Sequence, residues 1–158
     1  MTHALALASA ALLVAGCASM SPDRAATPNE MKVAFDVTSG NPQALMLQLT
    51  VIDMTRKQLI ERGITPKMVI AFRGDASYYT QTNLSMVKEA DRADALKIAR
   101  QLRDLRKASG VETLEQCNIP LASRKLKPAD LMQEVKLVPN GWISLAEYQA
   151  RGYSYIVP

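Results

Sequence analysis

This chain of 158 residues offers few side chains for chemistry, because it contains two cysteines and one histidine. Cys17 ends an apolar run near the start, and Cys117 follows a short β-rich stretch in the second half. His3 precedes the apolar run, so a product cleaved after that run has no histidine on which to build a zinc finger, a haem site or a Ser-His-Asp triad. Neither G-x-G-x-x-G nor G-x-x-x-x-G-K occurs, which disfavours a nucleotide site. The candidate chemistry is therefore that of a thiol.

The first thirty residues are typical of a targeting segment followed by a tether. Residues 4–16 contain Ser9 as their only polar side chain, and a run of this length suits a signal peptide but is shorter than the roughly 20 residues that span a bilayer. The run ends in Leu-Val-Ala-Gly-Cys, which resembles the lipobox of bacterial lipoproteins. We therefore predict a signal peptide at 1–16, lipidation of Cys17 and a linker at 17–30.

This targeting segment predicts a protein of the periplasm or cell envelope. Ala18 follows the lipidated cysteine where an Asp would favour the inner membrane, so we expect the outer membrane. The membrane is expected to be contacted through the lipid anchor only. If Cys17 is acylated, Cys117 is left as an unpaired thiol in a compartment that favours disulfides.

The remaining residues, 31–158, have the pattern of one α/β domain. Hydrophobic residues make up 48% of the chain and charged residues 22%, as in globular proteins, and the net charge of +4 is too small and too spread out for a nucleic-acid interface. Strands are predicted at 31–38, 67–72, 111–116, 135–138 and 153–157. Helices are predicted from Pro42 to Gly63, at 91–109, from Pro120, and at 144–151.

Local signals place the ends of these helices. Asn41 is a predicted N-cap with Pro42 at the first helical position. Ser144 and Glu147 have the spacing of a capping box that would begin the last helix. Trp142 is predicted to anchor that helix on the sheet, with lining of the site as the alternative. The stretch 76–90 fits either a loop or a short helix.

Strands that alternate with helices indicate a single three-layer domain with a five-stranded, mainly parallel, doubly wound sheet. In such a sheet the functional crevice lies at the carboxyl ends of the strands. The candidate segments are therefore 38–41, 73–79, 117–119 and 139–142. Cys117 lies in one of them.

Residues 31–158 resemble the DsrE/DsrF-like family. The resemblance rests on K-V-x-F-x-V at the first strand, on Glu-Gln-Cys ending at Cys117, and on the stretch from Leu137 to Pro158, which is similar to the ending of the family's exported branch. It implies a flavodoxin-like fold, a trimer or hexamer, and a persulfide carried on Cys117. Relay proteins of the family have Arg-Arg-Gly after the cysteine, whereas this chain has Arg124-Lys125-Leu126, and an exported protein meets no tRNA, so only the thiol chemistry is carried over.

Cys117 is thus the predicted nucleophile, with Arg73, Asn118, Arg124 and Lys125 as predicted binding residues. A thiol becomes a thiolate more readily beside a helix N-terminus or a cation, and the helix opened by Pro120 could supply the first of these. Glu112 and Glu115 oppose the effect unless the strand turns one of them away.

Two functions fit this pattern. The first is an exported sulfur carrier or sulfur transferase that takes a sulfur atom from a donor protein or small sulfane-sulfur compound and gives it to an acceptor. The alternative is a non-catalytic, oligomeric ligand- or partner-binding module in which Cys117 is a small buried apolar residue. Neither requires a cofactor or a metal.

Overall fold

Five parallel strands form the centre of the computed structural model, which describes residues 28–158. The strand order is β4-β3-β2-β1-β5, and every neighbouring pair is parallel. The strands are β1 (Glu30–Val37), β2 (Thr65–Phe72), β3 (Val111–Cys117), β4 (Val135–Val138) and β5 (Ser154–Ile156). The helices are α1 (Pro42–Glu61), α2 (Arg92–Lys107), α3 (Asn118–Ser123) and α4 (Gly141–Ala150), with 3₁₀ segments η1 (Gly74–Thr80), η2 (Glu89–Asp91) and η3 (Pro128–Asp130).

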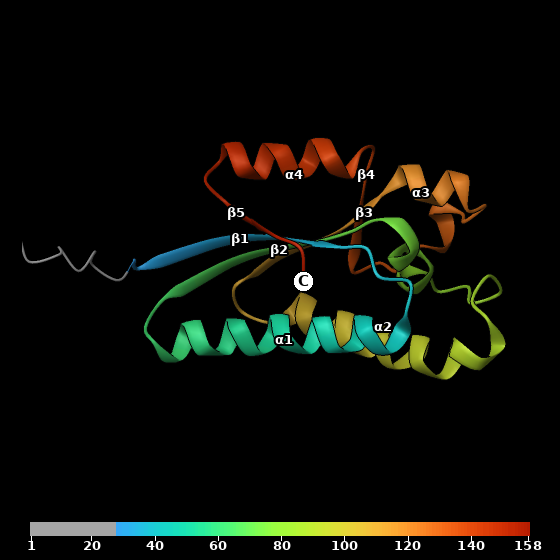
Figure 1. Ribbon diagram of the computed structural model, residues 1–158, viewed down its shortest axis with the longest axis horizontal. Coiled ribbons are helices and arrows are strands. Elements are labelled where there is room, and N and C mark those ends of the chain that lie inside the picture. The colour runs from blue at the N-terminus through green and yellow to red at the C-terminus, as the bar shows by residue number, and fades with distance from the viewer. Residues whose placement is uncertain (1–27) are drawn as a thin grey trace, which may run out of the picture.

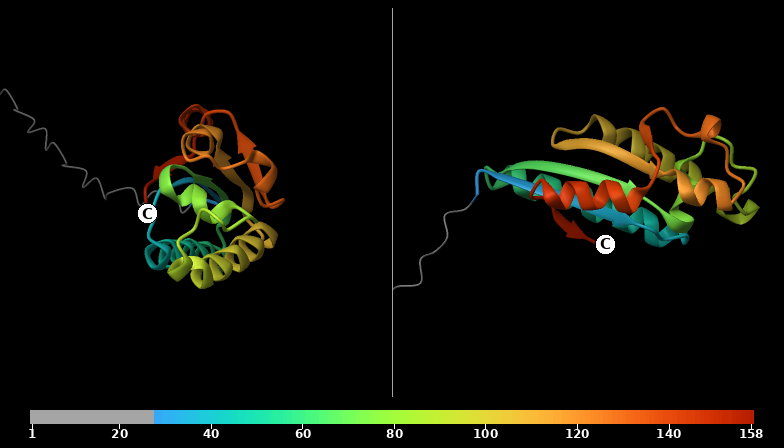
Figure 2. Two further views of the ribbon diagram at one scale, coloured as in Figure 1. Left: turned by 90° about the vertical axis from the view of Figure 1, so that its right-hand side faces the viewer. Right: turned by 90° about the horizontal axis from the view of Figure 1, so that it is seen from above.

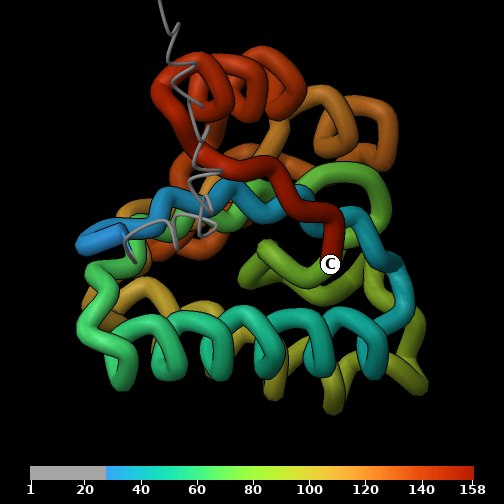
Figure 3. The backbone as a smooth tube through the Cα atoms, turned by 60° about the vertical axis from the view of Figure 1, so that its left-hand side comes forward, coloured from blue at the N-terminus to red at the C-terminus, as the bar shows by residue number. Residues whose placement is uncertain are grey.

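Helices cover both faces of this sheet. In Figure 1, α1 and α2 lie below the strands, and α3 and α4 lie above them. The two turned views in Figure 2 show the same layers from the end and from above. The predicted three-layer α/β domain with a parallel five-stranded sheet is therefore confirmed. Figure 3 shows the C-terminal strand β5 returning beside β1, with which it pairs.

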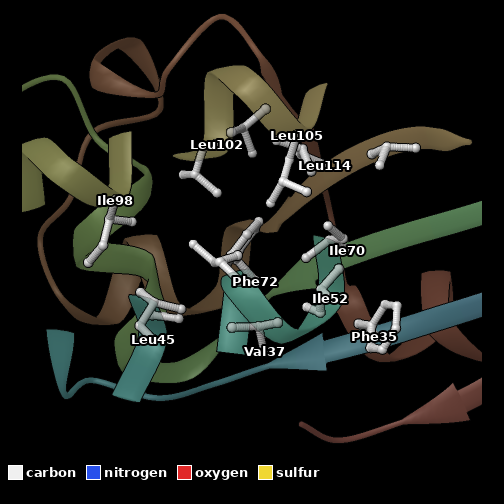
Figure 4. Close-up of a cluster of buried hydrophobic side chains, with 14 of the residues drawn as sticks. Phe35, Val37, Leu45, Ile52, Ile70, Phe72, Ile98, Leu102, Leu105 and Leu114 are labelled. Atoms are coloured by element: carbon white, nitrogen blue, oxygen red, sulfur yellow. The ribbon is translucent and has the colours of Figure 1, made fainter. Parts of the chain in front are cut away.

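The main hydrophobic core lies between the sheet and the α1/α2 layer (Figure 4). Leu45 and Ile52 of α1 and Ile98 of α2 are almost completely buried there against Ile70 and Phe72 of β2. Apolar residues three or four positions apart form one face of each helix, which is why these two helices lie flat on the sheet.

The opposite face of the sheet has a much smaller apolar cluster. Ala34, Val69 and Ala71 of the sheet meet Leu145 and Tyr148 of α4 there. Small strand residues let α4 approach closely but give it little apolar area to bury. Polar contacts between α4 and β3 therefore matter for the position of this helix.

Of the two helix N-termini predicted from local signals, that of α1 is confirmed and that of α4 is wrong. The N-cap at Asn41 is confirmed, because its Oδ1 accepts a hydrogen bond from Ala44 N–H at 3.0 Å. The capping box at Ser144 is wrong: α4 begins three residues earlier, at Gly141, and its N-cap is Asn140, whose Oδ1 accepts from Trp142 N–H at 3.0 Å. The Ser144 hydroxyl instead donates to Glu115 of β3.

Candidate active site around Cys117

Cys117 lies at the base of a pocket formed where the carboxyl ends of β2, β3 and β4 meet. It is the last residue of β3, and its side chain is 4% exposed. The pocket has a volume of about 210 Å³, and Arg73, Ile119, Arg124 and Trp142 are among the residues that line it. The pocket is therefore large enough for a few non-hydrogen atoms next to the sulfur.

The sulfur atom accepts a hydrogen bond from the first residue of α4. Gly141 N–H donates to Cys117 Sγ with an N···S distance of 3.1 Å. Gly141 begins a helix of ten residues, so the N–H carries the partial positive charge of a helix N-terminus. An N–H in this position can donate to a sulfur atom that carries negative charge. Cys117 also lies at the N-terminus of the helix that follows it, as the sequence predicted, because it is the N-cap residue of α3. Its side chain makes no capping hydrogen bond there, and the donor to the sulfur belongs to α4.

Gly141 is the residue type that allows this contact. A Cβ atom at position 141 would lie 2.8 Å from Cδ of Arg73 and 3.0 Å from Cβ of Cys117. Contacts this short do not occur without displacement of the neighbours. The absence of a side chain therefore lets α4 start directly over the cysteine.

Arg73 reaches the pocket from the end of β2 and is paired with a buried carboxylate. Its Nε donates to Asp36 Oδ1 at 2.8 Å, and its Nη2 donates to Oδ2 of the same side chain. Asp36 is 1% exposed at the end of β1 and also accepts from the Tyr155 hydroxyl at 2.6 Å. The hydrogen bond to Asp36 raises the pKa of Arg73. The charge of Arg73 is thus balanced inside the fold.

The ring of Trp142 packs against the guanidinium group of Arg73. The centre of its ring lies 5.3 Å from Arg73 Cζ, and the residue is 68% exposed. The prediction that Trp142 anchors α4 on the sheet is therefore wrong. It forms part of the pocket wall instead, because its neighbour is the arginine and not the apolar cluster.

The other predicted binding residues are not equally close to Cys117. Arg124 lines the pocket, and its Nε donates to Asp75 Oδ1 at 2.8 Å. Asn118 and Lys125 are absent from the pocket lining; Asn118 is half-buried and Lys125 is exposed. Cys17, the predicted lipidation site, lies outside the described residues.

A buried polar network holds the backbone of Cys117 from the α1/α2 face of the sheet. Gln116 Nε2 donates to the Cys117 carbonyl and to Ser77 Oγ, both at 2.8 Å. Thr80 Oγ1 donates to Gln116 Oε1 at 2.8 Å. These bonds tie η1 to the end of β3 and satisfy a glutamine that is completely buried.

The two glutamates of β3 lie in different surroundings. Glu112 is exposed and accepts from the Tyr153 hydroxyl. Glu115 is 1% exposed and accepts from the hydroxyls of Ser144 and Tyr148, the latter at 2.9 Å. Burial, together with the hydrogen bond to Glu115, raises the pKa of Tyr148 to about 12.

Sequence reasoning missed three parts of this site: Asp36, the Gly141 amide and the Gln116 network. Asp36 stands among strongly apolar residues of β1, and an isolated polar residue in a buried strand was the available signal. Gln116 was not marked in this way, because Glu112, Thr113 and Glu115 of the same strand are also polar. The Gly141 contact had no such signal, although position 141 falls within the candidate segment 139–142. Across residues 28–158, no group of three or more His, Cys, Asp or Glu side chains is arranged to hold a metal ion.

Comparisons with known proteins agree with this architecture. The model of the DsrE/DsrF-like family matches residues 31–158. A curated protein of Aquifex aeolicus (strain VF5), described as uncharacterized, is 29% identical over 126 residues, which cover 80% of this chain and 55% of that protein. This chain therefore spans about half the length of its curated relative.

A solved structure has the same fold. It is the protein of unknown function MTH1491 from Methanobacterium thermoautotrophicum, with a TM-score of 0.57 and 16% sequence identity. The match covers 81% of this chain and 99% of that one. At this level of identity the likeness concerns the fold alone.

Proposed function

The chain belongs to the DsrE/DsrF-like family, and on that premise we propose that it is a sulfur carrier that holds a persulfide on Cys117. Family membership suggests a role in sulfur relay. The observation that carries the proposal is the hydrogen bond from Gly141 N–H to Cys117 Sγ at 3.1 Å, at the base of a pocket. A buried cysteine that only filled space would need neither the amide nor the pocket.

The proposed reaction needs no separate oxidant or reductant. The Cys117 thiolate attacks the outer sulfur of a sulfane-sulfur compound such as thiosulfate. The new S–S bond forms as the donor's S–S bond breaks, and the bonding pair leaves with sulfite. In the second step an acceptor thiolate attacks the outer sulfur of the persulfide, and Cys117 departs as the thiolate.

The surroundings of Cys117 support both steps. The Gly141 amide stabilises the negative charge on Sγ before attack and after transfer. The pocket provides room for the outer sulfur, with Arg73 and Arg124 in its wall. With the side chain only 4% exposed, large oxidants meet the sulfur less readily than they would at the surface.

We also propose that the protein is exported, anchored in the cell envelope through lipidated Cys17, and assembled as a homo-oligomer. The lipobox-like run before Cys17 supports the first two points. Exposed apolar side chains at Ile119 and Trp142 in the pocket wall, and at Ile143 next to Trp142 in sequence, support the third. No helix within residues 28–158 is long and apolar enough to cross a membrane.

Intact mass measurement tests the proposed function. The full chain carrying Cys17→Ser is exposed to thiosulfate or inorganic polysulfide, and the Cys17→Ser/Cys117→Ser double variant serves as the matched control. We expect the addition of one sulfur atom that a mild reductant removes and that is absent from the double variant. No added sulfur, together with slow alkylation of Cys117 at neutral pH, would instead support the binding-module alternative.

A further inference from the structure

Helix α4 contacts β3 through three polar interactions on one side of the helix. Gly141 N–H donates to Cys117 Sγ, and one and two turns further along, the hydroxyls of Ser144 and Tyr148 donate to Glu115. Positions 141, 144 and 148 recur at helical spacing and so lie on the same face of α4. Glu115 and Cys117 are two residues apart on β3 and therefore point to the same face of the sheet.

Stability alone does not account for Glu115. Its carboxylate is 1% exposed, and none of the ion pairs among residues 28–158 involves it. A buried carboxylate without a cation loses much of its solvation, and apolar residues can replace such polar clusters without loss of stability. Unlike an apolar side chain, the carboxylate forms directional hydrogen bonds. Each of its two oxygens accepts one hydrogen bond from a hydroxyl group of α4.

The hydrogen bonds to Glu115 hold α4 close to the point where its first residue, Gly141, must contact Cys117 Sγ. The small apolar cluster under α4 would allow the helix to slide or rotate, since apolar contacts have no directional preference. The two hydroxyl bonds to Glu115 oppose such movement. On the basis of the proposed function, we propose that Glu115 is a positioning residue. It holds α4 through Ser144 and Tyr148, so that Gly141 N–H remains hydrogen-bonded to Cys117 Sγ and the sulfur stays reactive.

The charges around Cys117 allow this role to be distinguished from a simple charge effect. Arg73 from β2 is balanced by Asp36 from β1, to which Tyr155 of β5 also binds, and Arg124 after α3 is balanced by Asp75 of η1. On β3 itself, the carboxylate of Glu115 lies two residues from Cys117 and on the same face of the sheet. Replacing the two hydroxyls of α4 removes no charged residue, so the test changes the position of α4 and not the set of charged residues around Cys117.

The test compares the pH dependence of Cys117 alkylation in full-length Cys17→Ser protein. The test variants are Ser144→Ala, Tyr148→Phe and the double variant. The matched control is Tyr153→Phe, which removes the same kind of bond, from a tyrosine hydroxyl to the other glutamate of β3, Glu112, without contact to α4's first turn. Thermal unfolding of each protein reports on stability separately.

We expect the double variant to move the alkylation midpoint upward by at least about 0.5 pH unit, which is about threefold less thiolate at neutral pH. Ser144→Ala alone should move it in the same direction, and this small change provides a second measurement if the double variant does not fold. Tyr153→Phe should lower the unfolding temperature but leave the midpoint unchanged.

Two results would overturn the inference in distinguishable ways. If the parent protein alkylates readily at neutral pH but the folded Ser144→Ala and Tyr148→Phe variants keep its midpoint or lower it, Glu115 is not a positioning residue while the sulfur-carrier proposal stands. If the parent protein itself neither alkylates at neutral pH nor takes up sulfur, the proposed function fails, and the role of Glu115 fails with it.

Discussion

Replacing Gly141 with alanine tests the contact on which the reactivity of Cys117 depends. The added Cβ would lie 2.8 Å from Arg73 Cδ and 3.0 Å from Cys117 Cβ. Neither neighbour moves easily, because Arg73 is held by Asp36 on two hydrogen bonds and Cys117 ends a central strand. We therefore expect the start of α4 to move outward by roughly half an ångström, enough to restore ordinary van der Waals separation.

The magnitude follows from the hydrogen bond that this movement stretches. The N···S distance is 3.1 Å in the native protein. A hydrogen bond to a charged group contributes about 1.5–3 kcal/mol, and about 1.4 kcal/mol corresponds to a factor of ten, so its complete loss would slow reaction of the sulfur by about 10- to 100-fold. A stretched bond retains part of this, and we expect alkylation of Cys117 at pH 7 to slow by about tenfold.

The assay is the rate of alkylation between pH 5 and 10, followed by mass in the Cys17→Ser background. Overpacking at this position is expected to cost about 1–3 kcal/mol of folding stability, so a control must share that loss. Gly152→Ala provides it: Gly152 follows the other end of α4 with φ +84° and has no neighbour within 4 Å of an added Cβ, so the substitution strains the backbone far from Cys117. If folded Gly141→Ala protein keeps the native alkylation rate at pH 7, the amide does not support the reactivity of Cys117 and our reasoning is refuted.

Three further predictions concern the surroundings of the site. Arg73→Met leaves the buried Asp36 carboxylate without its cation and should cost about 3–5 kcal/mol in urea unfolding, whereas Asp36→Asn/Arg73→Met should recover most of that loss; equal losses would contradict the pairing. The pKa values of Tyr148 and Tyr153 are raised to about 12, so stability should hold up to about pH 10 and fall as pH rises toward 12; Tyr148→Phe should reduce this alkaline loss by up to about 2 kcal/mol when urea midpoints at pH 9 and 11.5 are compared, and an unchanged loss would show that Tyr148 does not cause it. Trp142→Ala should open the pocket and speed Cys117 alkylation at every pH without moving its midpoint, and a slower rate would exclude Trp142 as a barrier.

The sequence predicts the sheet well because the signals for it are local. The five strand segments are short β-rich runs that end at turns, and α1 and α2 repeat apolar residues at helical spacing. The parallel arrangement then follows from the alternation of strands and helices. The rule that parallel strands present their carboxyl ends together places Cys117 and Arg73 in candidate segments from the sequence alone.

The details of the site depend on contacts between residues far apart in sequence. Ser144 and Glu147 have the spacing of a capping box, but the Ser144 hydroxyl binds Glu115, 29 residues away. Asp36 and Arg73 are 37 residues apart, and nothing local indicates that they pair. A local sequence pattern predicts the hydrogen bonds that a side chain can form within its own helix. It does not predict hydrogen bonds to residues that are distant in sequence and become neighbours only in the folded protein.

The pairing of both pocket arginines changes how the thiolate is stabilised. Arg73 and Arg124 each face a carboxylate, so neither brings an uncompensated positive charge to the pocket. The direct hydrogen-bond donor to the sulfur is the amide at the start of α4, which acts only at hydrogen-bond distance. A charge can act from several ångströms away and tolerates small displacements, but an amide does not. The reactivity of Cys117 therefore depends on how accurately α4 is placed, and for that reason the glycine at its first position and the carboxylate under its first two turns are the parts of the site most sensitive to change.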